Sequence, residues 1–333
     1  MPITTDPDEV RKILVIQLGP FGDILLTTAY FEYLKNRYIG VEITYLIKKK
    51  YLAIVKDHPY VDRFMFLEKD NGLSYYLERI KMTIKIRKQK YDIVIDQQNL
   101  ISTKIFTFFS KAAARIGYKN SRLDFVYNVK AERGPKRYNA AVRFDLIKPL
   151  GISPGPYQLV YKINQQSFKY VSDWIAKEKI NRFFVISPGS PVNWKKWNIK
   201  LYAQAAAHIA KKSKLIAVWL WARSEKNDAL EGIRLMGENS IMAPPTSLDQ
   251  AAALLRNSEL LICNDGGINH LAAAIGVKTI ALFGATDPLD WSPAADFKTH
   301  HHLYNQENNS KKDNSFGITV EELVDLTIKV LDE

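Results

Sequence analysis

The feature that most constrains the fold of this chain is an alternation of short apolar segments with amphipathic ones, which occurs in two successive series. Short apolar runs predict buried strands, and apolar residues at helical spacing predict helices. Strands separated by helices are typical of parallel sheets that are covered on both faces. In the first series, strands are predicted at residues 12–16, 42–47, 64–67, 91–95 and 115–118, and helices at about 23–38, 73–89 and 103–111.

Turn-forming residues between Pro149 and Pro156 separate the two series and indicate a domain boundary. The second series has predicted helices at about 168–178, 199–211, 225–236, 248–256 and 267–275, and strands at 183–187, 215–220, 240–242, 260–263 and 279–283. Residues 300–316 are polar and predicted to be irregular, and a last helix is predicted at about 320–331. We therefore predict an α/β protein with two Rossmann-like domains, residues 1–155 and 156–316, and a C-terminal helix within 317–333.

The formal net charge of +12 predicts an anionic partner. A phosphorylated substrate, a nucleotide, an acidic membrane surface and a nucleic acid all fit this charge, which does not choose among them. The single cysteine, Cys263, excludes an internal disulfide and a cysteine-based metal site, and its apolar neighbours predict that it is buried. No apolar run is long enough to cross a bilayer. We therefore expect a cytoplasmic protein.

The sequence Asn-Asp-Gly-Gly-Ile-Asn-His, which begins at Asn264, lies between a predicted strand and a predicted helix. Such a junction presents unpaired backbone N–H groups and the positive end of the helix dipole at one point. It therefore predicts an anion site, most often for a phosphate. The alternative interpretation is that Asp265 only caps the helix.

A second glycine-containing junction follows the first predicted strand and reads Gln-Leu-Gly-Pro-Phe-Gly-Asp, ending at Asp23. Gly19 and Gly22 allow the backbone to approach a ligand closely. The segment lacks the third glycine of the dinucleotide-binding pattern, and the next strand leads into three lysines instead of an acidic residue. Asp23 is therefore either a helix N-cap or a general base.

A third segment opens the second domain, where a predicted strand leads into a Pro/Gly/Ser loop that contains Gly189 and Ser190. Lys195 and Lys196 follow before the next helix. Flexible backbone donors near a cation suit a diphosphate group. The alternative is a basic surface loop without a ligand.

Taken in order, the three segments resemble glycosyltransferase family 9, the heptosyltransferases that build the inner core of lipopolysaccharide. The resemblance extends from Lys12 to about Pro293 and includes the segments 21–27, 247–249, 284–288 and 291–293. It implies a GT-B fold, in which two Rossmann-like domains with parallel sheets face each other across a cleft. The first domain would bind the acceptor and the second the nucleotide-sugar.

The resemblance also implies inverting transfer from a nucleotide-diphosphate sugar, typically ADP-heptose, to a lipid-linked or phosphorylated glycan acceptor. The enzyme would work in the cytoplasm, with peripheral contact to an anionic membrane at the inner face of the cytoplasmic membrane. No other cofactor is expected. No carboxylate cluster has the spacing of a magnesium site, so no metal is predicted.

The resemblance implies a role for particular residues. Asp23 matches the candidate base, with Gly19 and Gly22 in the acceptor-side loop, and Lys195 matches the lysine that meets the donor phosphates. The remaining donor-binding residues implied in this way are Gly189, Ser190, Glu225 near the ribose, Thr246 near the base, and Asp265, Gly266, Gly267 and His270 at the start of a helix. The chain departs from the family in the loop 219–224, where two tryptophans and an arginine stand in place of frequent glycines and can reshape the donor pocket.

Other functions remain open from the residues themselves. A sugar-nucleotide epimerase or hydrolase fits the same scaffold, because fold alone does not decide chemistry. A basic nucleic-acid-binding protein explains the charge but not the glycine-acid turns, and the chain lacks an RNA-binding aromatic signature and zinc ligands, so no nucleic acid partner is predicted.

Two charged or titratable segments also have two interpretations each. The basic helix at 73–89 is either a solvated face or a contact for anionic headgroups or a phosphorylated acceptor; its cations are Lys81, Lys85, Arg87 and Lys88, followed by Lys90. The three consecutive histidines from His300 to His302 are either a metal site or, as we expect, a solvated loop.

Overall fold

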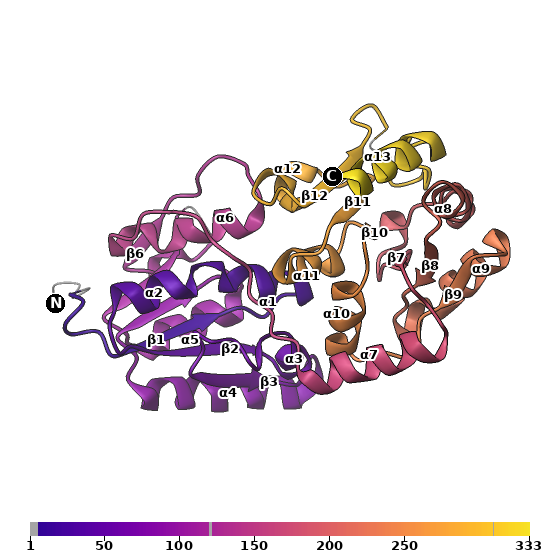
Figure 1. The fold of residues 1–333 in the computed structure, drawn as a ribbon. Coiled ribbons are helices and arrows are strands. Elements are labelled where there is room, and N and C mark those ends of the chain that lie inside the picture. Colours follow the sequence, from indigo (N-terminus) through magenta and orange to yellow (C-terminus); the bar gives the residue numbers. More distant parts are fainter. Residues whose placement is uncertain (1–5, 120–121, 309) are drawn as a thin grey trace. The chain divides into compact units, whose positions relative to one another are not determined.

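A computed structural model describes residues 6–119, 122–308 and 310–333 of the chain (Figure 1). The chain divides after Tyr161 into two compact units. Each unit has its own six-stranded sheet, and neighbouring strands run parallel in both. The prediction of an α/β protein with two Rossmann-like domains is therefore confirmed. Within the described ranges, no helix is both long enough and apolar enough to cross a membrane.

The sheet of the N-terminal unit has the strand order β3-β2-β1-β4-β5-β6. Its strands are β1 (Lys12–Ile16), β2 (Glu42–Lys48), β3 (Arg63–Leu67), β4 (Ile93–Asp96), β5 (Ala114–Tyr118) and β6 (Val129–Ala131). Its helices are α1 (Phe21–Thr27), α2 (Phe31–Arg37), α3 (Leu52–Val55), α4 (Gly72–Gln89), α5 (Ile101–Ser110) and α6 (Asn139–Arg143). The central strands are apolar runs because helices cover both faces of the sheet.

The direction in which the chain crosses this sheet reverses at β1, which pairs with both β2 and β4. Right-handed crossovers then place α1, α2 and α3 on one face of the sheet and α4 and α5 on the other. Figure 1 shows α2 and α4 on opposite sides of the sheet. Because a helix that follows a parallel strand begins at the carboxyl edge, α1, α4 and α5 all begin at that edge, where such sheets bind ligands.

The sheet of the C-terminal unit has the order β12-β11-β10-β7-β8-β9. Its strands are β7 (Phe183–Ser187), β8 (Ile216–Trp219), β9 (Ser240–Met242), β10 (Leu261–Asn264), β11 (Thr279–Phe283) and β12 (His300–Tyr304). Its helices are α7 (Gln165–Lys177), α8 (Ile199–Ser213), α9 (Lys226–Met236), α10 (Leu248–Arg256), α11 (Gly267–Ile275), α12 (Pro288–Trp291) and α13 (Val320–Asp332).

Two apolar cores lie on the two faces of the second sheet. Alternate residues of β7 point to opposite faces, so Phe184 packs with the core under α8 and α13, and Val185 with the core under α10 and α11. Cys263 belongs to the second of these cores and is fully buried, as predicted. Burial raises the pKa of its thiol, so it is a packing residue.

The structure corrects two expectations about secondary structure and adds a strand, β6, that no sequence pattern predicted. The helix predicted at 23–38 is interrupted by a 3-10 turn at Thr28–Tyr30, which separates α1 from α2. Strand β6 is too short to give a periodic signal. Residues 300–316 are not irregular throughout, because β12 pairs with β11 along its whole length. The histidine segment is therefore an edge strand, not a solvated loop, and His300 is buried.

The burial of His300 makes the stability of the fold depend on pH. Its Nδ1 lies 3.2 Å from the Thr299 hydroxyl oxygen, and burial lowers the pKa of the imidazole from 6.5 to about 4. Between these two pH values the unfolded chain binds more protons than the folded chain. The free energy of unfolding therefore falls as the pH decreases from 6.5 towards 4.

We expect the wild-type chain to lose about 2 kcal/mol of unfolding free energy between pH 7 and pH 5 that a His300→Gln variant does not lose. Urea unfolding at the two pH values measures this difference. A His208→Gln variant is the control, because His208 is exposed on α8 and the variant should keep the wild-type dependence. The same pH dependence in wild type and His300→Gln would contradict the assignment.

Candidate active site

Asp23 lies in the first turn of α1, just beyond the carboxyl end of β1. The helix begins at Phe21, its N-cap is Pro20, and no side chain caps it. Asp23 is the third residue of the helix, so the N-cap interpretation of this carboxylate is wrong. About a fifth of its side chain remains exposed, which leaves it accessible to a ligand.

Arg143, the last residue of α6, pairs with Asp23 through its Nη2 and the Asp23 Oδ1. The guanidinium is largely buried, and its Nε has no hydrogen-bond partner among the described residues. No sequence pattern indicates this contact, because the two residues are 120 positions apart and Arg143 belongs to no recognised motif. The pair fixes the orientation of the Asp23 carboxylate through a charge-assisted hydrogen bond.

Gly19 explains how the backbone passes so close to the Asp23 carboxylate. A Cβ atom added at Gly19 would lie 2.9 Å from the Asp23 Oδ2, closer than real Cβ contacts, and 3.0 Å from the Gln17 Oε1, which is tighter than most of them. The Gly19 N–H donates to the same Gln17 oxygen at 3.0 Å. Gly22 is the second residue of α1 and is half-buried. Gly19 and Asp23 are therefore brought together as one turn at the sheet edge.

A second carboxylate of the N-terminal unit, Asp96, ends β4 opposite Ile16 of β1. It is fully buried, and burial raises its pKa to about 6. Its Oδ2 accepts a hydrogen bond from the Tyr127 hydroxyl at 2.7 Å, and its Oδ1 accepts one from the Asn99 N–H at 2.9 Å. Because its oxygens are already used and enclosed, Asp96 is a structural residue that shapes this edge.

In the C-terminal unit, Lys195 and Asp265 form an ion pair with 2.5 Å between Nζ and Oδ2. The two residues come from separate sequence segments, the loop after β7 and the end of β10. Asp265 is nearly buried, whereas about a quarter of the Lys195 side chain is exposed. The structure therefore brings two of the predicted donor-binding segments together and leaves the lysine accessible.

Asn264 holds these two segments in place. Its side chain is buried, its Oδ1 accepts from the Trp197 N–H at 2.9 Å, and its Nδ2 donates to the Pro188 carbonyl oxygen at 2.7 Å. The Tyr202 hydroxyl donates to the same Oδ1 at 3.0 Å. One amide therefore ties both ends of the loop 188–197 to the end of β10. Sequence reasoning included Asn264 in the turn but did not identify this role.

The turn after β10 leads into α11 through Gly266, which is the N-cap and is extended. No side chain caps this helix, so Asp265 is not its cap. Among the first-turn N–H groups of α11, which starts at Gly267, that of Asn269 donates to the Gly266 carbonyl oxygen at 3.2 Å, so those of Gly267 and Ile268 are left for a ligand. His270 lies in this helix, is buried, and packs with its ring centroid 6.2 Å from that of Trp291.

Gly189 and Glu225 are also neighbours. A Cβ atom at Gly189 would lie 2.1 Å from the Glu225 Oε2, so only glycine leaves room for this carboxylate. Burial raises the pKa of Glu225, whose position precedes α9. Ser190 is buried and its hydroxyl accepts from the Val192 N–H at 3.2 Å. Thr246 lies in the loop between β9 and α10, and no hydrogen bond among the described residues links it to the Lys195–Asp265 pair.

Trp219, the first tryptophan of the segment 219–224, has a different role from the one expected. Trp219 is fully buried, and a Cβ atom at Gly232 of α9 would lie 2.2 Å from its ring. Trp221 is half-buried and donates its indole N–H to the Ala243 carbonyl oxygen at 2.8 Å. Trp219 therefore fills the core under α9, whereas Trp221 is half-buried and Arg223 is exposed.

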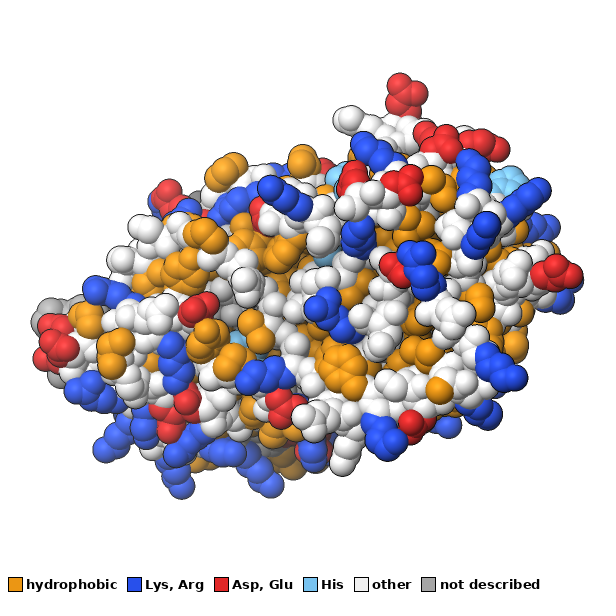
Figure 2. Space-filling view, viewed as in Figure 1, with side chains coloured by type: hydrophobic (Ala, Val, Ile, Leu, Met, Phe, Trp, Pro, Cys, Tyr) orange, Lys and Arg blue, Asp and Glu red, His pale blue; other side chains and the backbone are white. Residues whose placement is uncertain are grey.

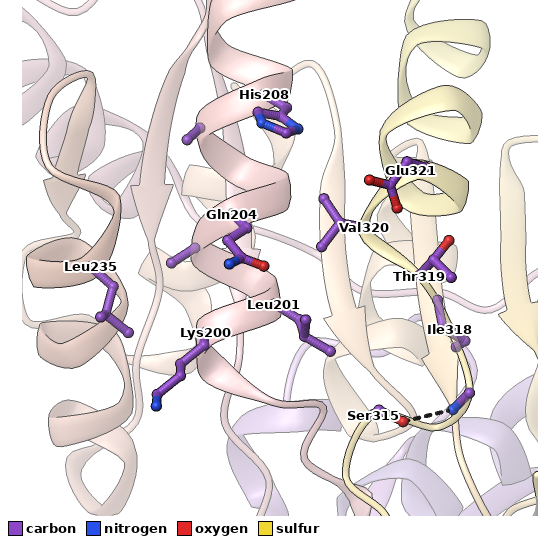
Figure 3. A pocket seen from close by; sticks show the side chains of 13 residues that line it. Lys200, Leu201, Gln204, His208, Leu235, Ser315, Ile318, Thr319, Val320 and Glu321 are labelled. Carbon is purple, nitrogen blue, oxygen red and sulfur yellow. Dashed lines mark hydrogen bonds between the residues drawn. The ribbon is translucent and has the colours of Figure 1, made fainter.

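The C-terminal unit also has a groove of about 900 Å³ between α8 and the start of α13 (Figure 3). Gln204 and His208 of α8 and Glu321 of α13 line it. None of the predicted donor-binding residues does. In the described part of the chain, no group of three or more His, Cys, Asp or Glu side chains could hold a metal ion.

Comparison with known proteins identifies the family. The sequence model of glycosyltransferase family 9 (heptosyltransferase) matches residues 79–318, which is more than half of the chain. The chain belongs to glycosyltransferase family 9. The matched part of this family 9 protein includes Lys195, Glu225 and Asp265, whereas Asp23 precedes it.

Relatives and solved structures cover almost the whole family 9 chain. It is 25% identical to lipopolysaccharide heptosyltransferase 1 of Campylobacter coli, over 83% of this chain and 84% of the relative. A crystal structure of a family 9 glycosyltransferase from Veillonella parvula superposes with a TM-score of 0.82, at 20% identity over 96% of this chain and 97% of that one. E. coli heptosyltransferase WaaC with ADP-2-deoxy-2-fluoro heptose superposes with a TM-score of 0.73, at 17% identity over 96% and 99%. The GT-B fold predicted for the chain is thereby confirmed.

Proposed function

We propose that this family 9 enzyme transfers heptose from ADP-heptose to a lipopolysaccharide core or a related cell-surface glycan, with inversion at the anomeric carbon. The observation that carries the proposal is the Lys195–Asp265 pair at the start of α11. A cation beside the N-terminus of a helix is suited to a diphosphate. The Campylobacter coli relative and WaaC, both heptosyltransferases, support heptose as the sugar, and the ligand of WaaC supports ADP as its carrier.

In the proposed reaction Asp23 is the general base. Its carboxylate takes the proton of an acceptor hydroxyl while that oxygen attacks the anomeric carbon of the donor. The bond between the anomeric carbon and the diphosphate oxygen breaks, and ADP leaves with the electron pair of that bond. Arg143 holds the Asp23 carboxylate in one orientation for this proton transfer.

The leaving diphosphate gains negative charge, and the C-terminal unit supplies the compensating groups. Lys195 and the first-turn N–H groups of α11 stabilise it without a metal ion. Glu225 accepts a hydrogen bond from a ribose hydroxyl, with Gly189 leaving space for that carboxylate. The loop that contains Thr246 passes the adenine, and Ser190, Gly266, Gly267 and His270 complete the donor site.

The acceptor is a lipid-linked or phosphorylated glycan, bound on the side of Gly19 and Gly22. We place the enzyme in the cytoplasm, peripheral to the inner face of the cytoplasmic membrane. The net charge of +12 supports such anionic partners.

A thermal-shift panel tests the donor. ADP, UDP and GDP, each with and without a heptose or hexose, are added at matched concentrations to the full chain. We expect ADP-heptose to raise Tm most, because a ligand at 100 times its Kd stabilises a protein by about 2.7 kcal/mol. If no nucleotide shifts Tm while RNA does, the proposal is wrong. Consumption of ADP-heptose without an acceptor would instead support an epimerase or hydrolase.

A further inference from the structure

Helix α4 has an unusual distribution of apolar side chains. It buries Met82 and Ile86 against the unit, as a surface helix should. The opposite side of the same helix carries five large apolar side chains that are 49–75% exposed: Leu73, Tyr76, Leu77, Ile80 and Ile84. At helical spacing these five positions form one stripe, where a surface helix normally carries polar residues.

Helix α5 repeats this arrangement beside α4. It buries Phe106 and exposes a stripe formed by Ile101, Ile105, Phe108 and Phe109, each 36–54% exposed. The two helices pack against each other, and the Arg87 side chain of α4 donates to a carbonyl oxygen at the end of α5. The two stripes, from Leu73 to Ile84 and from Ile101 to Phe109, therefore form one apolar surface, named here the α4–α5 face.

Cations lie along the α4 side of the α4–α5 face, whereas the two helices together carry a single acid. Lys81, Lys85, Arg87 and Lys88 lie along α4, and none of them forms an ion pair with another described residue. Figure 2 shows Lys and Arg side chains gathered along the edge of the N-terminal unit that α4 forms in Figure 1. The single acid of α4, Glu78, accepts hydrogen bonds from two backbone N–H groups of the preceding loop, and α5 has no acidic residue.

We propose that the α4–α5 face docks the enzyme on an anionic phospholipid bilayer. The apolar stripes enter the interfacial region, and the lysines contact the headgroup phosphates. A second copy of the chain is a poorer partner, because a two-fold contact through this face would bring the cations of the two α4 helices together. A nucleic acid would match the charge but not the nine exposed apolar side chains beside it, whereas a bilayer accounts for both properties.

The position of this face relative to Asp23 gives the docking a purpose. Helices α4 and α5 begin at the carboxyl edge of the N-terminal sheet, and α1, which carries Asp23, begins at the same edge. A glycan attached to a lipid in the bilayer would therefore meet the base at the rim of the docked face. This purpose rests on the proposed function, whereas membrane binding itself does not.

Co-sedimentation of the full chain with vesicles tests the proposal. The vesicles contain phosphatidylcholine alone or with about 30% phosphatidylglycerol, a composition that gives them negative surface charge. We expect binding to the anionic vesicles only. Charge reversal at Lys81, Lys85 and Lys88 should weaken it at least about tenfold, and the double variant Ile80→Asp, Ile84→Asp should abolish it.

The control variants make the same chemical changes on the C-terminal unit. Reversal of the exposed Lys177, Lys211 and Lys329 changes the net charge equally, and the double variant Leu230→Asp, Leu235→Asp replaces two exposed apolar side chains of α9. Both controls should bind vesicles within about twofold of wild type, since the surface potential acts only over about a Debye length. Thermal unfolding confirms that every variant folds.

Three results would overturn the proposal: α4 variants that bind like wild type, controls that weaken binding as much as the α4 variants, and α4 variants that convert a dimer to a monomer in light scattering.

Heptose transfer is assayed separately. The α4 variants should keep transfer to a soluble, delipidated acceptor and lose transfer to an acceptor in vesicles. Absence of transfer to either acceptor by wild type would refute the proposed function and leave the vesicle result standing.

Discussion

Replacing Asp23 by asparagine should lower kcat for heptose transfer by roughly 10²–10⁴-fold, the range of general-base contributions. The amide has nearly the shape of the carboxylate but does not accept a proton at neutral pH. Initial rates with ADP-heptose and a lipopolysaccharide core acceptor measure the effect. Donor binding should persist, because the proposed donor contacts all lie in the C-terminal unit.

The Asp23–Arg143 pair requires a control for folding. Removal of one member of a largely buried pair leaves the other charge unpaired, which costs stability. We therefore compare Asp23→Asn with Glu32→Gln, which changes the same charge at an exposed position of α2 and should keep full activity. Substantial turnover by Asp23→Asn, or loss of its thermal shift with ADP-heptose, would remove Asp23 from the role of base.

Replacing Lys195 by alanine should lower kcat by about 10²–10³-fold, as loss of one preorganised charge-stabilising group does in other enzymes. The leaving diphosphate would keep only the N–H groups of α11 as compensation. Single-turnover measurements separate this effect from product release. Lys196→Ala is the matched control, because Lys196 pairs with Asp228 at 2.7 Å instead of Asp265.

The double variant Lys195→Ala, Asp265→Asn distinguishes catalysis from stability. The single variant leaves the nearly buried Asp265 carboxylate without its partner, and the fold loses stability for that reason. The double variant removes this charge, so Tm should recover while turnover stays low. Recovery of turnover together with Tm would show that Lys195 serves the fold and not the donor phosphates.

The elements that could be predicted from the sequence are those whose signal is local. The strands β1, β7, β10 and β11 are apolar runs bounded by turns, and the structure has them where the pattern predicts. Strand β12 was missed because its histidines are polar, and it is a strand only because the neighbouring β11 offers a free edge. A single-sequence pattern does not contain that neighbour.

The residues of the candidate site differ in the same way, because some have a local sequence signal and others depend on a distant element. Glycine-acid turns at Gly19–Asp23 and Asn264–Gly267 are local signals, and so their positions at strand ends could be predicted. Arg143 could not, because its contact with Asp23 depends on how α6 returns to the sheet edge. Trp219 was misread for a similar reason, since only the packing of α9 against β8 shows that it faces the core. The roles of Glu225 and Thr246 remain predictions.

The amide of Asn264 limits how the phosphate-side loop can move. The amide donates to the Pro188 carbonyl oxygen and accepts from the Trp197 N–H. Both ends of the loop therefore stay fixed to the end of β10. A rearrangement on donor arrival or ADP departure is thereby restricted to the short span between them, which includes Lys195. Lys195 can move towards or away from a ligand while the two ends of the loop stay in place. A change of conformation at this site would therefore involve only the few residues between Pro188 and Trp197.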